Sequence, residues 1–353
     1  MTVLKLGSLF DGIGVFPLAA MHCGMEPVWA SEIEARPISI TKRHFPDMLH
    51  LGDLTKISGA EIPPVDVITF GSPCQDLSQI GTRNGFAGKK SSLFYQAMRI
   101  IEEMRYATNG RYPAFCIWEN VAGAFSSNDR LDFAAMLSAF TGAEVSVPPR
   151  GWAHAGMVRG GCADTAWRLL DAQYWGEPAL AQRRKRVFVV ADFTGQRAGE
   201  VLFKPRTVLP FSAIGGPGGL SATAGSGVPA AQTGRQVPIV RPFSLRRMRT
   251  MAQVGDQKGF CTSFGRGGEP FPTLLASVTA PFSFWYEGEE QDGFLRVLTP
   301  LECERLMGLP ENWTKYGCKN EEISDHARYR ALGNSIALSC AEYVMAGIAE
   351  VMN

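Results

Sequence analysis

The chain has 353 residues, of which 45% are hydrophobic and 20% charged, and its formal net charge is +1. This composition supplies enough apolar material for a substantial core and excludes a disordered or fibrous protein. The charge is unevenly spread, because segment 182–249 contains twelve basic residues against only Asp192 and Glu200. Such a segment in an otherwise acidic chain indicates a polyanionic ligand; the alternative is a solvated basic face.

The sequence also disfavours a membrane protein and a protein stabilised by disulfide bonds. No stretch approaches the roughly 20 apolar residues that a membrane helix needs, and the first residues lack the pattern of a secretory signal. We therefore expect a soluble, cytoplasmic protein. The eight cysteines are scattered without a Cys-x-x-Cys pair, so the sequence predicts neither a metal site nor a disulfide framework.

The first 120 residues alternate short apolar runs with amphipathic segments, which is typical of a doubly wound α/β sheet. The predicted strands are 4–9, 26–31, 65–70 and 114–118, with 167–171 and 186–191 as a further pair on the same sheet. The predicted helices are 14–22, 35–44, 92–103 and 130–140.

After Phe193 the composition changes, because 210–238 is dense in Gly, Ala, Ser and Pro and cannot support regular helices. Short strands are expected within 260–286, and a helix follows Pro300. The apolar segment 335–351 predicts a long helix that needs a core to bury it. The simplest placement returns this helix to the first sheet, so that the smaller domain is an insertion.

A glycine turn follows the first strand, where Gly12 and Gly14 open the first predicted helix. Glycines there let a ligand approach the backbone, and the helix N-terminus favours an anionic group. Glu32 ends the second strand, where a carboxylate commonly holds ribose hydroxyls, and Asp53 follows near a third strand edge. Together these residues indicate a cofactor that carries adenosine. Each acid could instead be a surface turn residue.

Reactive side chains follow the later strands. Cys74 lies on a Ser-Pro turn after strand 65–70, Glu119 ends the next strand, and Arg184 and Arg186 precede a further one. A thiolate nucleophile, a carboxyl group that donates to a ring nitrogen and guanidinium groups suit attack on a polarised heteroaromatic ring such as cytosine. The alternative for Cys74 is a small residue that fills a turn.

Taken in order, these motifs resemble the DNA cytosine carbon-5 methyltransferases, bacterial or phage-borne, over nearly the whole chain except 195–265. The motifs that carry the resemblance are Leu9-Phe10-Asp11-Gly12-Ile13-Gly14, Ser31-Glu32, Gly52-Asp53, Ser72-Pro73-Cys74-Gln75, Glu119-Asn120-Val121, Gln182-x-Arg184-x-Arg186, Leu298-Thr299-Pro300-x-Glu302-Cys303 and Gly333-Asn334-Ser335. The resemblance implies a Rossmann-like fold that binds S-adenosylmethionine, with a small, mostly β or irregular target-recognition domain inserted into it.

The resemblance also implies roles for the catalytic residues. Cys74 would attack carbon 6 of a flipped cytosine, Glu119 would hydrogen-bond ring N3 and the amine, and Arg186 would lie near O2. Arg184 would orient the catalytic loop or a phosphate. Segment 75–88 would close over the base as a lid.

Further positions match the family's contacts. For the cofactor they are Phe10, Gly12, Ile13, Gly14, Glu32, Ile33, Asp53, Leu54, Leu93, Asn334 and Ser335, and for DNA they are Gln75, Ser78, Arg83, Thr273 and Leu274. The chain departs from the pattern at three places. Ser8 stands where many members have Asp, Asp11 where Ala or Ser is usual, and Ile33 where an aromatic often stacks on adenine.

The resemblance thus leads us to expect a discontinuous catalytic domain, 1–193 with 325–353, and a recognition domain, 194–324. We expect a monomer that acts on double-stranded DNA; a cognate restriction endonuclease, a role in protecting a phage genome and an orphan role all stay open. The competing hypotheses are an RNA cytosine-5 methyltransferase, a DNA-binding protein whose catalysis has decayed, and a nicotinamide or flavin oxidoreductase.

Overall fold

The computed structural model describes residues 3–72, 93–204, 239–243, 271, 273–274, 283–287 and 294–353. Two compact units make up the chain. Unit 1 comprises Met1–Leu170, Lys185–Arg206 and Cys340–Asn353, and unit 2 comprises Asp171–Arg184 and Thr207–Ser339. The domain bounds expected from the resemblance stay a prediction.

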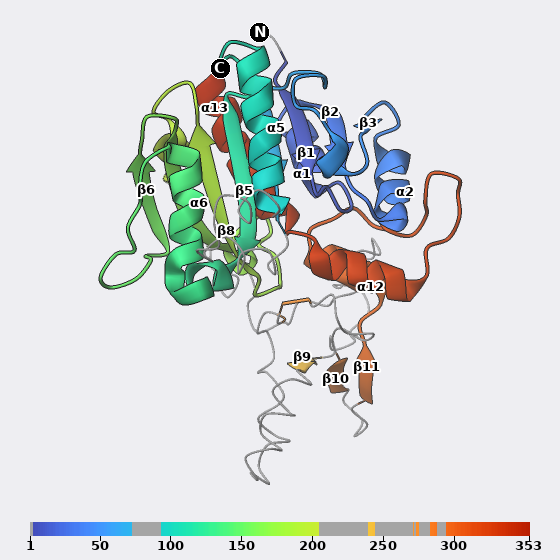
Figure 1. Cartoon of the computed structure of the whole chain (residues 1–353). Helices are drawn as coiled ribbons and strands as arrows, with labels where there is room; N and C mark the ends of the chain where they lie inside the picture. The colour runs from blue at the N-terminus through green and yellow to red at the C-terminus, as the bar shows by residue number, and fades with distance from the viewer. Residues whose placement is uncertain are drawn as a thin grey trace. The chain divides into compact units, whose positions relative to one another are not determined.

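An eight-stranded sheet forms the centre of unit 1, with the strand order β3-β2-β1-β4-β5-β8-β7-β6 (Figure 1). The pairs β1–β2, β2–β3, β1–β4 and β4–β5 are parallel, whereas β5–β8 and β6–β7 are antiparallel. The strands are β1 Lys5–Leu9, β2 Glu26–Ser31, β3 Leu49–His50, β4 Val67–Phe70, β5 Phe115–Val121, β6 Ala155–Arg159, β7 Asp164–Asp171 and β8 Lys185–Asp192.

The central strands are buried on both faces, which explains their unbroken apolar runs. On β4, Ile68 and Phe70 belong to the hydrophobic cluster under α5 (Leu93–Ala107) and α6 (Leu131–Thr141), and Val67 faces the other side. Figure 1 shows α5 and α6 in front of the sheet and α13 behind it. Because side chains alternate along a strand, each strand contributes to both layers.

The second face of the sheet is covered by α1 (Val15–His22) and the part of α13 (Leu338–Met352) that lies in unit 1, and α2 (Ala35–His44) contacts the turn before α1. Tyr343 on α13 receives a hydrogen bond of 2.9 Å from Arg168 on β7, and its hydroxyl donates to the Leu202 carbonyl at 2.6 Å. Leu202 ends the short helix α7 (Ala198–Leu202). The prediction that the last helix returns to the first sheet is therefore confirmed.

The described residues of unit 2 form a three-stranded antiparallel sheet with the order β11-β10-β9 and two helices. The strands are β9 Ile239–Phe243, β10 Ser283–Glu287 and β11 Phe294–Val297, and the helices are α11 Pro300–Leu306 and α12 Asp325–Asn334. Thr299 and Glu302 form a capping box that fixes the start of α11. Within the described part of the chain, no single helix is long and apolar enough to cross a membrane; α12 and α13 meet that test only as a bent pair.

The predicted elements of the α/β sheet are confirmed, with boundary shifts of a few residues. Helix α6 starts one residue later than predicted, after Asn128, Asp129 and Arg130, which all have positive φ. The last helix starts at Leu338 rather than 335, because a separate helix ends at Asn334. Strands β3 and β6 were not predicted.

Candidate active site

The turn from β1 to α1 has an unusual backbone conformation, with left-handed residues that favour glycine. Phe10, Gly12 and Gly14 all have positive φ, of 54°, 59° and 79°. A Cβ added to Gly12 would meet nothing within 4 Å, whereas one on Gly14 would lie 2.9 Å from the Phe45 ring. Gly14 is therefore needed for packing. Gly12 leaves open space over the turn, which a ligand could fill.

Glu32 holds this turn from the end of β2. Its Oε2 accepts the Gly12 N–H at 2.9 Å, and its Oε1 accepts the N–H groups of Ile33 at 2.7 Å and Glu34 at 2.9 Å. The carbonyl of the same residue is also bonded, because the Thr41 hydroxyl donates to the Gly12 carbonyl at 3.1 Å. The carboxylate of Glu32 is thus fixed in place next to the open side of the turn.

Asp53 lies beyond the next strand at the start of a short 3-10 helix, η1 (Leu54–Lys56). Its Oδ1 accepts the Thr55 N–H at 3.0 Å and the Thr55 hydroxyl at 2.8 Å, and these bonds lower the pKa of the exposed Asp53 carboxyl. The Ser31 hydroxyl donates to the Gly52 carbonyl at 2.6 Å, which ties this loop to the end of β2. A Cβ on Gly52 would also meet nothing within 4 Å.

The remaining predicted cofactor residues of unit 1 are placed by their elements. Ile13 and Leu54 are buried, Leu93 begins α5 and is partly buried, and Ile33 is 71% exposed. Open space at Gly12 and Gly52, with the carboxylates of Glu32 and Asp53 beside it, fits a group that carries a ribose and an adenine. The described residues of unit 1 are therefore compatible with an adenosine cofactor.

The end of β4 is anchored to β5 by side-chain hydrogen bonds. The Trp118 indole donates to the Ser72 hydroxyl at 3.1 Å, and the Asn120 amide donates to the Ser72 carbonyl at 3.0 Å. Asn120 also accepts the Val121 N–H at 2.8 Å. Ser72 is the last described residue before the segment with Cys74, Gln75, Ser78 and Arg83, which lie outside the described residues.

Glu119 and Arg186 form an ion pair at the same edge of the sheet. Arg186 Nε lies 3.0 Å from Glu119 Oε1, and the two side chains are only 13% and 12% exposed. Since β8 is antiparallel to β5, its first residues reach the edge where β5 ends, and Val121 pairs with Arg186. A Cβ on Gly71 would lie 3.0 Å from Glu119 Oε2, so a glycine here leaves room for the carboxylate.

Arg184 belongs to unit 2 and is fully buried. Its guanidinium donates to the carbonyls of Leu274 at 3.0 Å, Gly333 at 2.9 Å and Ser335, and its N–H donates to Asp171 at 3.0 Å. The guanidinium therefore joins the segments that contain Leu274 and Ser335. A contact between Arg184 and a phosphate, or a role for it on the catalytic loop, stays a prediction.

Thr273 and Leu274, the two predicted DNA contacts in unit 2, lie next to Arg183 and Arg184. The Thr273 hydroxyl donates to the Arg183 carbonyl at 2.6 Å, and Arg183 N–H donates to the Phe271 carbonyl at 2.7 Å. Asn334 is the last residue of α12, and Ser335 caps it. These contacts order the segments that carry the predicted DNA and cofactor residues.

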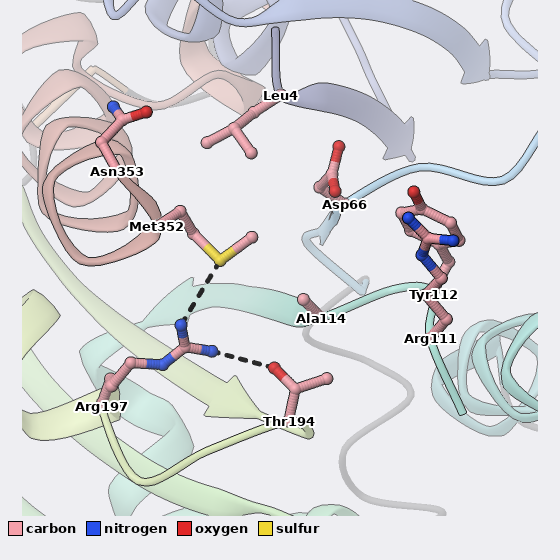
Figure 2. A pocket seen from close by; sticks show the side chains of 9 residues that line it. All are labelled: Leu4, Asp66, Arg111, Tyr112, Ala114, Thr194, Arg197, Met352 and Asn353. Carbon is pink, nitrogen blue, oxygen red and sulfur yellow. Dashed lines mark hydrogen bonds between the residues drawn. The ribbon is translucent and has the colours of Figure 1, made fainter. Parts of the chain in front are cut away.

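A cavity of about 440 Å³ lies at the opposite edge of the sheet of unit 1, where β1, β4 and β5 begin (Figure 2). Figure 2 shows Leu4, Asp66 and Ala114 beside it, with Arg197 donating to Thr194 and to the Met352 sulfur. Ligands of doubly wound sheets bind at the carboxyl ends of the strands. This cavity is therefore separate from the edge that carries Glu32 and Glu119.

The arrangement at the carboxyl edge agrees with a comparison against protein families. A family model described as C-5 cytosine-specific DNA methylase matches residues 4–204 and 243–350. The chain belongs to this family. The family assignment confirms the resemblance, the doubly wound α/β fold class and the enzyme class predicted from the sequence.

Curated relatives are distant but cover most of the chain. The type II methyltransferase M.HhaI of Haemophilus parahaemolyticus is 23% identical over 100% of this chain and 96% of its own length, and M1.ScrFI of Lactococcus lactis is 26% identical over 99% and 78%. A phage P1 protein named DNA N-6-adenine-methyltransferase is 24% identical over 98% of the chain. The match spans only 61% of that phage protein.

Solved structures support the fold. The Entamoeba histolytica methyltransferase superposes with a TM-score of 0.59 at 13% identity and full coverage of both chains. The S. pombe Dnmt2 methyltransferase gives 0.55 at 14% identity, covering 99% of each chain. At these identities the similarity concerns the fold alone.

Three residues of the edge were missed as site residues by sequence reasoning. Asn120 and Thr41 donate hydrogen bonds to the carbonyls of Ser72 and Gly12, and the Ser72 hydroxyl accepts one from the Trp118 indole. Ser72 and Asn120 lie inside quoted motifs, so their position was a usable signal. Thr41 lies within α2, and nothing in its sequence context indicates a contact with Gly12.

Proposed function

We propose that this protein transfers a methyl group from S-adenosylmethionine to carbon 5 of cytosine in double-stranded DNA. The observation that carries the proposal is that the cofactor turn and the Glu119–Arg186 ion pair lie at the same edge of the sheet. The open Gly12 turn with Glu32 and the Glu119–Arg186 pair both lie where the parallel strands β1, β2 and β5 end.

The short connection from Ser72 to Cys74 supports the role proposed for Cys74 as the nucleophile. Cys74 comes two residues after Ser72, and two extended residues span at most about 7 Å. Since Ser72 is hydrogen-bonded to Trp118 and Asn120 on either side of Glu119, this short connection supports placing the Cys74 thiol close to the carboxyl group of Glu119. Arg186 adds positive charge there, which favours the thiolate.

Bound S-adenosylmethionine supplies an electrophilic methyl group on a sulfonium. The thiolate of Cys74 forms a bond to carbon 6 of the cytosine, and the electron pair of the 5,6 double bond becomes available at carbon 5. In its protonated form Glu119 donates a hydrogen bond to ring N3 and stabilises the charge that develops on the ring, with Arg186 near O2. After carbon 5 has gained the methyl group, loss of its proton to a base expels the Cys74 thiolate and restores the double bond.

Access to the ring requires that the cytosine leave the DNA stack, at a cost of a few kcal/mol. This free-energy cost would be offset by contacts of the DNA backbone with Gln75, Ser78 and Arg83. Support of the flipped base by Thr273 and Leu274 would offset it further. The basic segment 182–249 supplies charge for phosphate contacts. The role in the cell would be that of an orphan enzyme, one half of a restriction system or protection of a phage genome, with the protein acting as a monomer.

The test is methyl transfer by the purified protein from labelled S-adenosylmethionine to duplex DNA and, separately, to transfer RNA, followed by nucleoside analysis. The proposal predicts label on 5-methylcytosine from DNA. Label on RNA alone would refute the proposed DNA substrate and would support an RNA cytosine-5 methyltransferase. Label on N6 of adenine, the activity in the name of the phage P1 relative, would refute the cytosine chemistry.

A further inference from the structure

Asp11 lies in the turn that opens α1, and its carboxyl group has an unusual environment. Both of its carboxyl oxygens are buried, and among the described residues neither has a partner in good hydrogen-bond geometry. The backbone of Asp11 is held in place, because its N–H donates to the Ser31 carbonyl at 3.1 Å and its carbonyl accepts the Gly14 N–H at 3.2 Å. A buried carboxyl without a partner is costly to ionise.

The groups that face this carboxyl come from three elements. Ser8 on β1 and Thr41 on α2 contribute hydroxyls, and Glu32 at the end of β2 contributes a negative charge. Glu32 is the one charged group among the described residues that acts on Asp11. Two carboxyl groups thus share one turn, and no cation of the described ranges acts on Asp11.

Burial raises the pKa of Asp11 to about 7, the hydroxyl of Ser8 opposes this rise, and the charge of Glu32 adds to it. The Asp11 side chain therefore exchanges its proton close to neutral pH. A positive charge arriving near the turn would favour the ionised form, since an opposite charge within about 4–6 Å lowers the pKa of a carboxyl by about 1–3 units.

We propose that Asp11 distinguishes the cationic methyl donor from its neutral product by giving up a proton to solvent when the cation binds. This inference rests on the proposed function, because it takes S-adenosylmethionine as the ligand of the turn. S-adenosylmethionine and S-adenosylhomocysteine both carry an ammonium and a carboxylate, and they differ in the charge of the sulfur. Only the donor thus brings the extra positive charge that the Asp11–Glu32 turn lacks.

The consequence for binding follows from linkage. If the donor lowers the pKa of Asp11 by one unit, its affinity rises tenfold as the pH passes through that range. The affinity of S-adenosylhomocysteine changes less over the same pH range, because its sulfur is neutral. The protein would then release the used cofactor more readily than it releases the donor at neutral and alkaline pH.

The experiment is isothermal titration calorimetry of the wild-type protein with each ligand at pH 7, in phosphate and in imidazole buffers, whose ionisation enthalpies differ. We expect a fraction of a proton to be released for each S-adenosylmethionine bound, and less for S-adenosylhomocysteine. The ratio of the Kd of the product to that of the donor should rise about tenfold from pH 5.5 to 8. Asp11→Asn should abolish the proton release and flatten the ratio, and the exposed Asp47→Asn should preserve both.

Donor binding without proton release by the wild type would overturn the inference and leave the proposed function intact. The same holds if Asp11→Asn releases as much proton as the wild type. If Asp11→Asn does not fold, Asp11→Ala and the wild-type measurement still decide the point. If the wild type binds neither ligand, the proposed function and this inference fall together.

Discussion

Arg186 Nε and Glu119 Oε1 lie 3.0 Å apart at the edge where β5 ends and β8 begins. Both side chains are nearly buried, so each charge depends on the other to offset its loss of hydration. A fully parallel sheet would place the first residue of β8 at the opposite edge. The antiparallel β8 therefore brings a guanidinium to the carboxyl group that we propose to hold the cytosine ring.

Glu119→Gln should lower the rate of methyl transfer by about 100-fold or more, because an amide of the same shape supplies less stabilisation of developing charge. The initial rate with labelled S-adenosylmethionine checks this. Glu311, whose carboxylate pairs with Arg305 at 2.6 Å on the surface, offers the control: Glu311→Gln should keep the wild-type rate. An unchanged rate for Glu119→Gln would exclude the role assigned to this carboxyl.

Gly12→Ala tests the open side of the cofactor turn. Both Gly12 and Gly24 have positive φ, and an added Cβ meets nothing within 4 Å at either position. Each alanine should therefore destabilise the fold by about 1 kcal/mol through backbone strain. Only Gly12→Ala should also weaken binding of S-adenosylmethionine, by about tenfold, as measured by calorimetry beside Gly24→Ala. Equal affinities of the two variants would show that the cofactor does not approach Gly12.

Arg184→Lys should destabilise unit 2, because a lysine ammonium cannot match the planar fork that reaches the carbonyls of Leu274, Gly333 and Ser335. Buried carbonyls left without donors cost about 1–3 kcal/mol each. We expect the free energy of unfolding to fall by about 3 kcal/mol in urea titrations. The exposed Arg111→Lys should change it by less than about 0.5 kcal/mol. If Arg184→Lys has the same free energy of unfolding as the wild type, these hydrogen bonds contribute little to the stability of unit 2.

Much of the sheet was predictable because its central strands are long apolar runs buried on both faces. Strand β3 has only two residues, and β6 is an edge strand whose residues alternate between exposed and half-buried. Such short or weakly apolar segments carry little periodic signal. Residues 128–130 have left-handed backbone conformations, and α6 begins only after them. The pattern of hydrophobic residues does not indicate these conformations.

The positions of the predicted site residues could be read from the sequence where strand order decides them, but not where packing does. The strand ends at Glu32 and Glu119 placed these acids on one edge. The burial of Arg184 against three carbonyl groups could not be predicted, because these carbonyls belong to segments that are far apart in the sequence. The burial of Asp11 could not be read from its turn, in which an acid is normally solvated.

The raised pKa of Asp11 also predicts how stability depends on pH. The folded protein keeps this proton up to about pH 7, whereas the unfolded chain releases it near 3.8. Stability therefore falls as the pH rises between these values and changes no further from this group above them. The difference corresponds to at most about 4 kcal/mol.

Asp11→Asn should thus be more stable than the wild type at pH 8 and lose this advantage towards pH 4. Urea titrations of both proteins at pH 5 and pH 8 measure the effect. An advantage of Asp11→Asn that is the same at both pH values would contradict an ionisable origin.

The central claim is tested most directly by conversion sequencing, with bisulfite or enzymes, of plasmid DNA from a host that lacks cytosine methylation and expresses this protein. The account predicts protected cytosines within one short sequence motif, and complete loss of protection in a Cys74→Ala control. Protection that persists in Cys74→Ala, or no protected cytosine with folded wild-type protein that binds S-adenosylmethionine, would contradict it.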